Sequence, residues 1–476
     1  MQFNSYEFIL IFLPLLLAGY FLLNRFSFKF GKIFLVCMGA VFYLQYGAAS
    51  ALVLLGSLLV NFAAAFLIAR GGRRARTILT LDIAANLALL FFFKYTNFML
   101  ANLAPLLRHD LRLRLFLPLG ISFFTFQQIS YVLYVRDRGR NETPLNYLLY
   151  ILYFPKLIMG PLAEPEQLLA QFDEVERKKP DWNNFACGLR LFALGLFKKM
   201  LLADTFSAAV GWGFANSLEA SSADLFLTML AYTFEIYFDF SGYSDMAVGI
   251  SQMLNIELPM NFDSPYRATS IRDFWKRWHI TLTGFLTRHV YYPLGGNRRG
   301  TARQYLNIMV VFLLSGIWHG ANWTFLLWGL LHGALSVWER VLEHRGKQIN
   351  SSAGWLGSFL SVNLLWLLFR ADSVRQWLSM LKRMLLLGST AVSDGLLQCF
   401  AIPEMGLLLP LLRLTPIRGA AALLFFVGAL LLCLLPENNY RCRDRLTPGG
   451  AVLAALALFS GFLHLGGESV FVYFNF

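Results

Sequence analysis

Apolar runs long enough to cross a lipid bilayer recur along the whole chain, and they restrict what it can fold into. A helix needs about 20 apolar residues to span the hydrocarbon core. Hydrophobic residues make up 57% of the 476 residues and charged residues only 14%, whereas soluble chains carry roughly 25% charged residues. The sequence therefore predicts an all-α integral membrane protein with about eleven transmembrane helices. The apolar runs cover residues 8–23, 33–50, 51–69, 77–100, 115–134, 224–256, 304–318, 321–338, 354–369, 419–435 and 449–464.

The positive charge of the chain is explained by its topology. The formal net charge is +13, and in membrane proteins Lys and Arg collect in cytoplasmic loops. The lipid bilayer is therefore the expected partner, and no nucleic acid is expected. The order of the basic clusters places both termini outside, although Arg108–Arg114 falls on the outer side and departs from the rule. The clusters expected in the cytoplasm are Asn24–Lys32, Arg70–Arg76, Arg136–Arg140, Glu174–Lys179, Arg272–Arg303 and Arg441–Arg445.

Three further stretches do not have the pattern of simple spans. Leu145–Pro161 is short and contains Pro155, which predicts a re-entrant segment buried in protein. Asn184–Trp212 and Ile271–Tyr292 are apolar but carry cations, which predicts helices at or entering the membrane interface.

No internal repeat is visible, and the five cysteines lack the spacing of metal ligands, so no metal site is expected. We therefore expect one polytopic domain over 1–476. Its parts are N-terminal spans (1–140), a catalytic core (141–345) and C-terminal spans with an external aromatic tail (346–476).

His319 is the first candidate for chemistry. Ionisable groups at membrane depth are costly and mark functional sites, and Ser315, Gly316 and Gly320 around His319 leave room for a substrate. A neutral imidazole there can accept a proton from a hydroxyl, as acyl transfer requires. The alternative is a histidine bonded to a neighbouring helix.

A second cluster places Glu235 and Asp239 on one helical face, followed by Ser241, Tyr243 and Asp245. Paired carboxylates can bind a metal or perform acid–base work. Because no further ligand stands at metal-binding spacing, the favoured interpretation is structural pairing with an intramembrane Arg or Lys.

A third cluster combines cations, aromatic residues and a glycine loop. Its cations can hold the phosphates of a nucleotide-bearing donor or anchor the chain to anionic lipid head groups. His279, beside Trp278, is either a second catalytic residue or a buried scaffold residue, with the scaffold favoured. The candidate donor-phosphate residues are Lys276, Arg277, Arg298 and Arg299.

Four segments together resemble the membrane-bound O-acyltransferase family, in its alginate O-acetyltransferase branch, which is related to the teichoic-acid D-alanyl transfer protein. They are Tyr237–Gly249, Phe274–Thr283, Tyr292–Arg298 and Trp318–Gly320. The resemblance extends through Phe3–Phe8, Phe93–Phe98, Pro118–Gln127 and Phe154–Pro161 to the C-terminus.

The resemblance implies a ring of transmembrane helices around a thin centre, with a funnel reaching the catalytic histidine from each side. It implies that His319 is the catalytic histidine and His279 the second motif histidine. Asp239, Ser241, Tyr243 and Asp245 would line or brace the funnel. Where the alginate branch has Arg-Asp-Tyr, this chain has Thr287-Arg288-His289, a departure that bears on the substrate.

The tail Ser469–Phe476 resembles tyrosine-containing aromatic ends in this group and on a small partner of the D-alanyl transfer system. If the C-terminus is outside, the Tyr473 hydroxyl can enter the outer funnel, receive the acyl group and pass it to a secreted partner. The alternative is an interfacial aromatic anchor.

Together these features predict an enzyme that moves an acetyl group across the bacterial inner membrane for O-acetylation of an exported, alginate-like polysaccharide. Acetyl-CoA, or an acyl-carrier thioester, is the expected donor, and no tightly bound cofactor is expected. The expected partners are a secreted or membrane-anchored acetyltransferase of the SGNH type and a cytoplasmic acyl carrier. Asn322 or a helix dipole would stabilise the oxyanion. The alternatives are D-alanyl transfer to teichoic acid, peptidoglycan O-acetylation, and a polysaccharide export channel or scaffold.

Overall fold

The computed structural model describes residues 1–476 except 108–112, 348–349, 387, 403–416, 467–470 and 472–476, and the described residues form helices without strands. The chain divides into two compact units, which we describe separately. Three of the five divisions fall inside continuous helices, α9 (Trp182–Phe197), α11 (Ser222–Met253) and α21 (Pro448–Leu463). Unit 1 comprises Met1–Leu194, Tyr243–Pro259 and Arg443–Ala455, and unit 2 comprises Gly195–Gly242, Met260–Cys442 and Leu456–Phe476.

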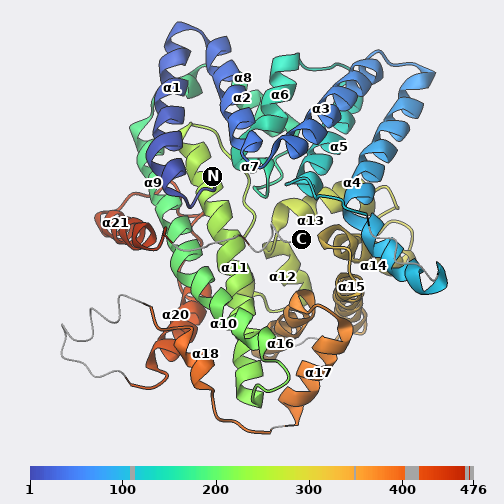
Figure 1. The fold of residues 1–476 in the computed structure, drawn as a ribbon. Coiled ribbons are helices and arrows are strands. Elements are labelled where there is room, and N and C mark those ends of the chain that lie inside the picture. Colours follow the sequence, from blue (N-terminus) through green and yellow to red (C-terminus); the bar gives the residue numbers. More distant parts are fainter. Residues whose placement is uncertain (108–112, 348–349, 387, 403–416, 467–470, 472–476) are drawn as a thin grey trace. The chain divides into compact units, whose positions relative to one another are not determined.

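Unit 1 is built mainly from helices that contact their neighbours in the sequence. The pairs α1 with α2 and α3 with α4 lie against each other, and α5 contacts both α3 and α4 (Figure 1). Most side chains of α5 are buried on all sides, including Gln127 and Gln128, so this helix is the centre of the unit. The helices here are η1 (Phe8–Phe12), α1 (Leu13–Phe26), α2 (Phe28–Leu44), α3 (Ala48–Ala69), α4 (Arg73–Leu107), α5 (Ile121–Arg138), α6 (Pro144–Leu152), α7 (Phe154–Leu157), α8 (Pro165–Asp173), η2 (Glu176–Lys178), the first part of α9, the end of α11 and the start of α21.

Two glycines change the boundaries that the apolar runs predict. The predicted run 33–50 is interrupted, because α2 ends at Leu44 and Gly47 adopts a φ of 108° before α3 begins. The predicted run 115–134 becomes helical only at Ile121, after Gly120 with a φ of 70°. Both φ values lie in a region that glycine enters without steric cost. Apolar content alone therefore placed these helix ends wrongly.

The predicted re-entrant segment has a broken backbone inside unit 1. Helix α6 ends at Leu152, and α7 starts again with Pro155 in its first turn. Lys156 on α7 is fully buried, donates a hydrogen bond of 2.6 Å to Gln127 Oε1, and lies 3.9 Å from the ring centre of Tyr150. The segment is thus buried in protein, as predicted, and its position across the bilayer stays a prediction.

Unit 2 contains a close antiparallel pair, α14 and α15, with α16 beside α15 (Figure 1). Glycines allow this approach: an ideal Cβ on Gly316 would lie 2.3 Å from the Phe325 carbonyl oxygen, and one on Gly329 would lie 2.4 Å from the Phe312 carbonyl oxygen. The helices of this unit are the end of α9, η3 (Lys198–Ala203), α10 (Asp204–Ala215), most of α11, η4 (Pro265–Arg267), α12 (Ile271–Arg277), α13 (Ile280–Leu286), η5 (Thr287–Tyr291), α14 (Thr301–His319), α15 (Trp323–His344), α16 (Ser351–Arg370), α17 (Val374–Leu385), α18 (Asp394–Gln398), α20 (Ala420–Leu434) and the end of α21.

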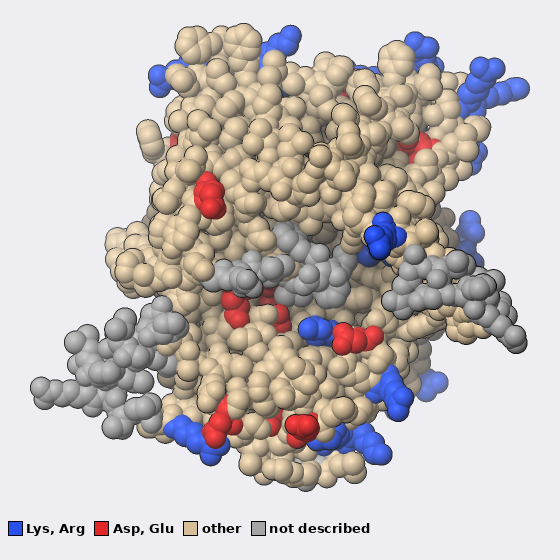
Figure 2. Space-filling view, in the orientation of Figure 1, with Lys and Arg blue, Asp and Glu red and all other residues tan. Residues whose placement is uncertain are grey.

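Several helices are long and apolar enough to cross a membrane. Among the described residues these are Phe8–Phe26, Ala48–Ala69, Arg73–Pro105 and Ser351–Arg370, with Ala420–Leu434 and Pro448–Leu463 as shorter apolar helices. On the face shown in Figure 2, most of the surface belongs to uncharged residues. The chain is a multi-pass membrane protein, and the count of about eleven spans stays a prediction.

Candidate active site

His319 ends helix α14, and helix α15 begins four residues later. Its ring is 4% exposed and is surrounded by other rings. The centroid distances are 4.9 Å to Trp318, 5.3 Å to Trp328 and 5.1 Å to Phe369. The imidazole therefore lies in an aromatic enclosure, next to the N-terminus of α15, whose partial positive charge favours anions.

His279 lies in the loop between α12 and α13, with its backbone in the left-handed region at φ 44°. Non-glycine residues rarely adopt this conformation, and it is often found at functional sites. The ring is 1% exposed and its centroid lies 4.8 Å from that of Phe240 and 6.1 Å from that of Trp318. The indole of Trp318 thus contacts both motif histidines.

Neither ring nitrogen of His279 has a hydrogen-bond partner among the described residues. Burial lowers the pKa of His279 to about 3, so the imidazole is neutral. A buried polar side chain without a partner needs an explanation, and a binding site is one. The absence of a hydrogen bond to either ring nitrogen among the described residues does not favour the scaffold interpretation of His279. The packing of the ring against Phe240 and Trp318 does favour it.

The strained loop of His279 is held by a second loop of the same unit. Ile280 N donates to the Asn261 carbonyl oxygen at 3.0 Å, and Thr281 Oγ1 donates to Asn261 Oδ1 at 2.6 Å. Asp263 N donates to the Arg277 carbonyl oxygen at 2.9 Å. These bonds on either side of His279 hold its unusual backbone conformation in place.

A cavity of about 250 Å³ opens beside this loop, between α12, α13 and η5 on one side and α14 and α15 on the other. Ser315, which lines it, precedes His319 by one helical turn on α14. Ser336 also lines it, is 3% exposed, and its Oγ has no partner among the described residues. The cavity therefore approaches His319 and contains a hydroxyl available to a ligand. Its lining is Arg272, Trp275, Lys276, Leu282, Thr283, Leu286, Thr287, Tyr291, Ile308, Val311, Phe312, Ser315, Ser336 and Arg340.

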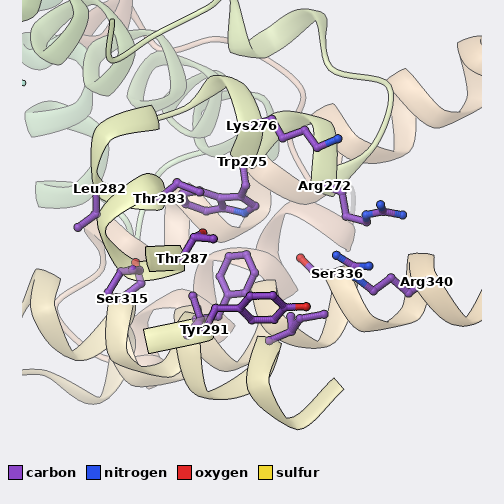
Figure 3. A pocket seen from close by; sticks show the side chains of 14 residues that line it. Arg272, Trp275, Lys276, Leu282, Thr283, Thr287, Tyr291, Ser315, Ser336 and Arg340 are labelled. Carbon is purple, nitrogen blue, oxygen red and sulfur yellow. The ribbon is translucent and has the colours of Figure 1, made fainter. Parts of the chain in front are cut away.

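Three cations line this cavity: Arg272, Lys276 and Arg340. In Figure 3 they lie toward one side, whereas Ser315 and Leu282 lie toward the other. Arg272 is paired with Glu343, but neither Lys276 nor Arg340 has an ion pair among the described residues. Burial, followed by the charge of Arg272, lowers the pKa of the Arg340 guanidinium below its usual value. This cationic side would therefore be stabilised by an anion.

The structure retains only one of the four predicted donor-phosphate residues in this lining, Lys276. Arg277 instead donates to Asp273 Oδ1 at 2.9 Å and to the Asp263 carbonyl oxygen at 3.3 Å. Arg298 and Arg299 are exposed on the glycine loop and do not line the cavity. These three arginines therefore lie outside the lining of this cavity, and their role in binding a donor phosphate stays a prediction.

Asp239 is engaged in a buried ion pair. Lys199 Nζ lies 2.7 Å from Asp239 Oδ1 and 2.8 Å from Asp204 Oδ1, and Lys199 and Asp239 are each 1% exposed. Asp239 is thus paired with a lysine, as the favoured structural interpretation expects. Lys199 is buried in protein, and the place of its stretch at or entering the membrane interface stays a prediction. Glu235, one turn earlier, has an Oε2 without a hydrogen-bond partner among the described residues.

The other predicted residues lie in different surroundings. Ser241 is buried in unit 2, whereas Tyr243 and Asp245 belong to unit 1, where Tyr243 stacks on Phe3 at 4.8 Å between centroids. Tyr473 lies outside the described residues.

Asn322 caps helix α15. Its Oδ1 accepts from Thr324 N at 3.2 Å, and its Nδ2 donates to the Asp372 carbonyl oxygen at 2.9 Å. Both polar groups are therefore used structurally, and the oxyanion role expected of Asn322 or a helix dipole stays a prediction.

Comparison of the chain with known proteins identifies its family. The family model described as "MBOAT, membrane-bound O-acyltransferase family" matches residues 74–350, more than half of the chain. The chain belongs to the membrane-bound O-acyltransferase family. The peptidoglycan O-acetyltransferase of Helicobacter pylori is 36% identical over 100% of this chain and 97% of its own length. A Pseudomonas aeruginosa protein named "Probable alginate O-acetylase AlgI" is 34% identical over 83% of this chain and 76% of its own length. The teichoic acid D-alanyltransferase of Bacillus subtilis is 28% identical over 50% of this chain and 62% of its own length.

As a membrane-bound O-acyltransferase, the protein is an enzyme, and the predicted acyltransferase class is confirmed. The sequence analysis missed Arg272, Ser336 and Arg340 of this O-acyltransferase's cavity. A signal was present: Arg272 and Lys276 are four residues apart, as are Ser336 and Arg340, so each pair shares a helical face. That the two faces meet depends on the contact between α12 and α15.

Proposed function

We propose that the protein transfers an acetyl group from acetyl-CoA, or another cytoplasmic thioester, across the bacterial inner membrane for O-acetylation of an exported polysaccharide. The observation that carries this proposal is His319, in its aromatic enclosure, one helical turn beyond the end of a cavity whose other side is cationic. An acyl thioester of a phosphorylated carrier has this polarity, because its acyl end is small and uncharged and its far end is anionic.

The cavity would hold the reactive end of the donor. Its volume of about 250 Å³ is below the roughly 300–1,000 Å³ of pockets that enclose a whole ligand, so it fits the acyl-pantetheine end better than a nucleotide. Lys276 and Arg340, which lack ion pairs among the described residues, would bind the donor's phosphates at the cationic side. Ser315 would then lie near the thioester.

The reaction follows from these positions. His319 accepts the proton of the attacking hydroxyl, whose oxygen forms a bond to the thioester carbonyl carbon. The carbonyl oxygen becomes negative beside the N-terminus of α15, which stabilises it. The carbon–sulfur bond breaks, the thiolate leaves on the cytoplasmic side, and the proton on His319 is released to it. His279 would line the path of the acceptor or brace Trp318.

The acceptor side is proposed from the sequence. With the C-terminus outside, the Tyr473 hydroxyl would receive the acetyl group and pass it to a secreted or membrane-anchored acetyltransferase of the SGNH type. An acyl-carrier protein is the alternative donor. Replacing Tyr473 with Phe removes the hydroxyl alone, so unchanged acetylation in that variant would contradict the relay.

Peptidoglycan is the acceptor that we favour among exported glycans. The relative named for peptidoglycan O-acetylation aligns over 100% of this chain, compared with 83% for the one named for alginate and 50% for the one named for teichoic acid. The alginate-like polymer expected from the sequence motifs is the second choice. Thr287-Arg288-His289, which departs from the alginate pattern, is consistent with this change.

A membrane-vesicle assay tests the proposal. Vesicles containing the protein and its cognate partner receive labelled acetyl-CoA on the cytoplasmic face, with peptidoglycan fragments or alginate oligosaccharides on the other. The expected result is label on peptidoglycan and none with the His319→Ala variant. Label on alginate alone would overturn the choice of acceptor, and label with the His319→Ala variant would overturn the mechanism.

A further inference from the structure

Trp275 and His332 form a hydrogen-bonded pair behind the cavity. Trp275 lies on α12 and His332 on α15, and Trp275 Nε1 donates to His332 Nδ1 at 3.2 Å. The exposed fractions are 8% for Trp275 and 0% for His332. Trp275 lines the cavity (Figure 3), and Phe312 also lines it, whereas His332 does not. The pair thus connects a cavity wall to a histidine that no ligand in the cavity reaches directly.

The direction of this bond determines the state of the imidazole. An indole nitrogen is only a donor, so His332 Nδ1 must be the acceptor and carries no proton. In a neutral ring the hydrogen is on Nε2, which has no hydrogen-bond partner among the described residues. Protonation of Nδ1 would place two N–H groups against each other. His332 is therefore neutral, and the lone pair on its Nδ1 accepts the hydrogen bond from Trp275.

The indole of Trp275 is separated from His319 by a single ring. The centroid of Trp328 lies 5.5 Å from Trp275, 4.8 Å from His332 and 5.3 Å from His319. The cavity wall formed by Trp275 is consequently connected to the aromatic enclosure of His319 through the ring of Trp328. A rotation of this indole would alter the cavity wall on the path to the proposed base.

The hydrogen bond that His332 accepts favours one orientation of the Trp275 indole. Phe274, Phe312 and Trp328, whose rings also contact Trp275, offer no acceptor comparable to a ring nitrogen. Without His332 Nδ1, the indole N–H would be buried without a partner, which is costly. Ser336 and Ser315 line the same cavity, and their hydroxyls could accept the N–H if the indole rotated into the cavity. That rotation would place the large ring where the ligand should lie.

We propose that His332 is a positioning residue for acyl transfer: by accepting the Trp275 hydrogen bond, it holds the indole clear of the cavity so that the donor's thioester end can reach His319. This inference rests on the proposed function, because it takes the cavity as the donor site. His332 does not touch the reacting atoms and exchanges no proton with them.

Four variants separate this role from general packing. His332→Phe keeps an aromatic ring and removes the acceptor, and Trp275→Phe removes the donor. The double variant removes both, and His332→Asn restores an acceptor near the position of Nδ1. Each is purified in the full-length chain and assayed with acetyl-CoA as the varied substrate, and then with the acceptor glycan as the varied substrate. Thermal stability is measured in parallel.

Positioning through the hydrogen bond predicts a specific pattern. In His332→Phe, kcat/KM for acetyl-CoA falls about tenfold, with the KM for the acceptor unchanged. His332→Asn recovers to within about threefold of the native enzyme. The double variant is no worse than Trp275→Phe alone, because the two substitutions remove one interaction.

Three results would overturn the proposal: native kcat/KM in His332→Phe, additive losses in the double variant, or His332→Asn as impaired as His332→Phe with native stability. If His332→Phe does not fold, His332→Leu, which also lacks an acceptor, replaces it, and a native kcat/KM in that variant refutes the proposal. His319→Ala serves as the reference. Activity in that variant refutes the proposed function itself, whereas an inactive His319→Ala beside fully active His332 variants refutes only this inference.

Discussion

Polar and ionisable groups are buried in unit 2 both around Lys199 and around the cavity. Around Lys199 they are paired with one another, whereas around the cavity some have no hydrogen-bond partner among the described residues. Lys199 lies between the carboxylates of Asp204 and Asp239, and its Nζ is also 4.5 Å from the ring centre of Phe471. Around the cavity, Ser336 Oγ and Arg340 Nε are buried without a hydrogen-bond partner among the described residues. Because an unmet buried polar group costs free energy, the first arrangement indicates structure and the second indicates a ligand.

The largest expected effect tests the catalytic side of this comparison. In His319→Ala, acetyl transfer should fall about a thousandfold, within the 10²–10⁴-fold range of general acid–base catalysis. The thermal unfolding midpoint should remain near that of the native enzyme, because His319 is assigned to the reaction and not to the stability of the fold. Transfer rates and unfolding curves measured on the same preparation provide the check. If the variant loses stability and activity together, His319 has a structural role and the catalytic assignment is contradicted.

The second prediction tests the structural side. Lys199→Ala leaves Asp239 buried without a counter-charge and should lower the free energy of unfolding by about 3–5 kcal/mol. The double variant Lys199→Met with Asp239→Leu should recover most of that loss, because it removes both buried charges. Chemical denaturation in detergent measures both values.

Lys198→Ala is the matched control, because the neighbouring Lys198 is half-buried and lies 5.9 Å from the Tyr237 ring centre. Its cost should be below about 1 kcal/mol. A native-like Lys199→Ala protein without transfer activity would show that the comparison is wrong.

The smallest effect concerns the cationic side of the cavity. Arg340→Ala should raise the KM for acetyl-CoA about tenfold, corresponding to the loss of about 1.4 kcal/mol of binding, and the penalty should shrink at high ionic strength. Arg298→Ala and Arg299→Ala provide exposed controls, with expected changes below about twofold. Equal effects of all three substitutions would indicate a general attraction of anions to the surface instead of a defined site.

Sequence reasoning predicted the membrane class and the family, because both depend on patterns written along the chain. Apolar runs reveal helices, and the motif around His319 reveals the family without any knowledge of packing. Gly47 and Gly120 displaced the predicted boundaries, since the conformation of a glycine inside an apolar stretch is not evident from hydrophobicity.

The sequence could not predict which residues that lie far apart in the chain contact each other in the fold. Arg277 is engaged by Asp273 and by the Asp263 carbonyl oxygen, whereas Arg340, about sixty residues further along, shares a cavity with Lys276. The third cluster of the sequence analysis identified a segment that carries cations. Which cations face the cavity depends on the contact of α12 with α15. His332 illustrates the same limit, because its hydrogen bond to Trp275 joins residues 57 positions apart.

Mass spectrometry of the exported glycan tests the central claim most directly. Cells that produce the native protein and cells that produce His319→Ala at the same membrane level would be compared for acetyl esters on their peptidoglycan. We predict acetylated muropeptides from the first and none above background from the second. Equal acetylation in the two strains would contradict the assignment of His319 as the base for acyl transfer.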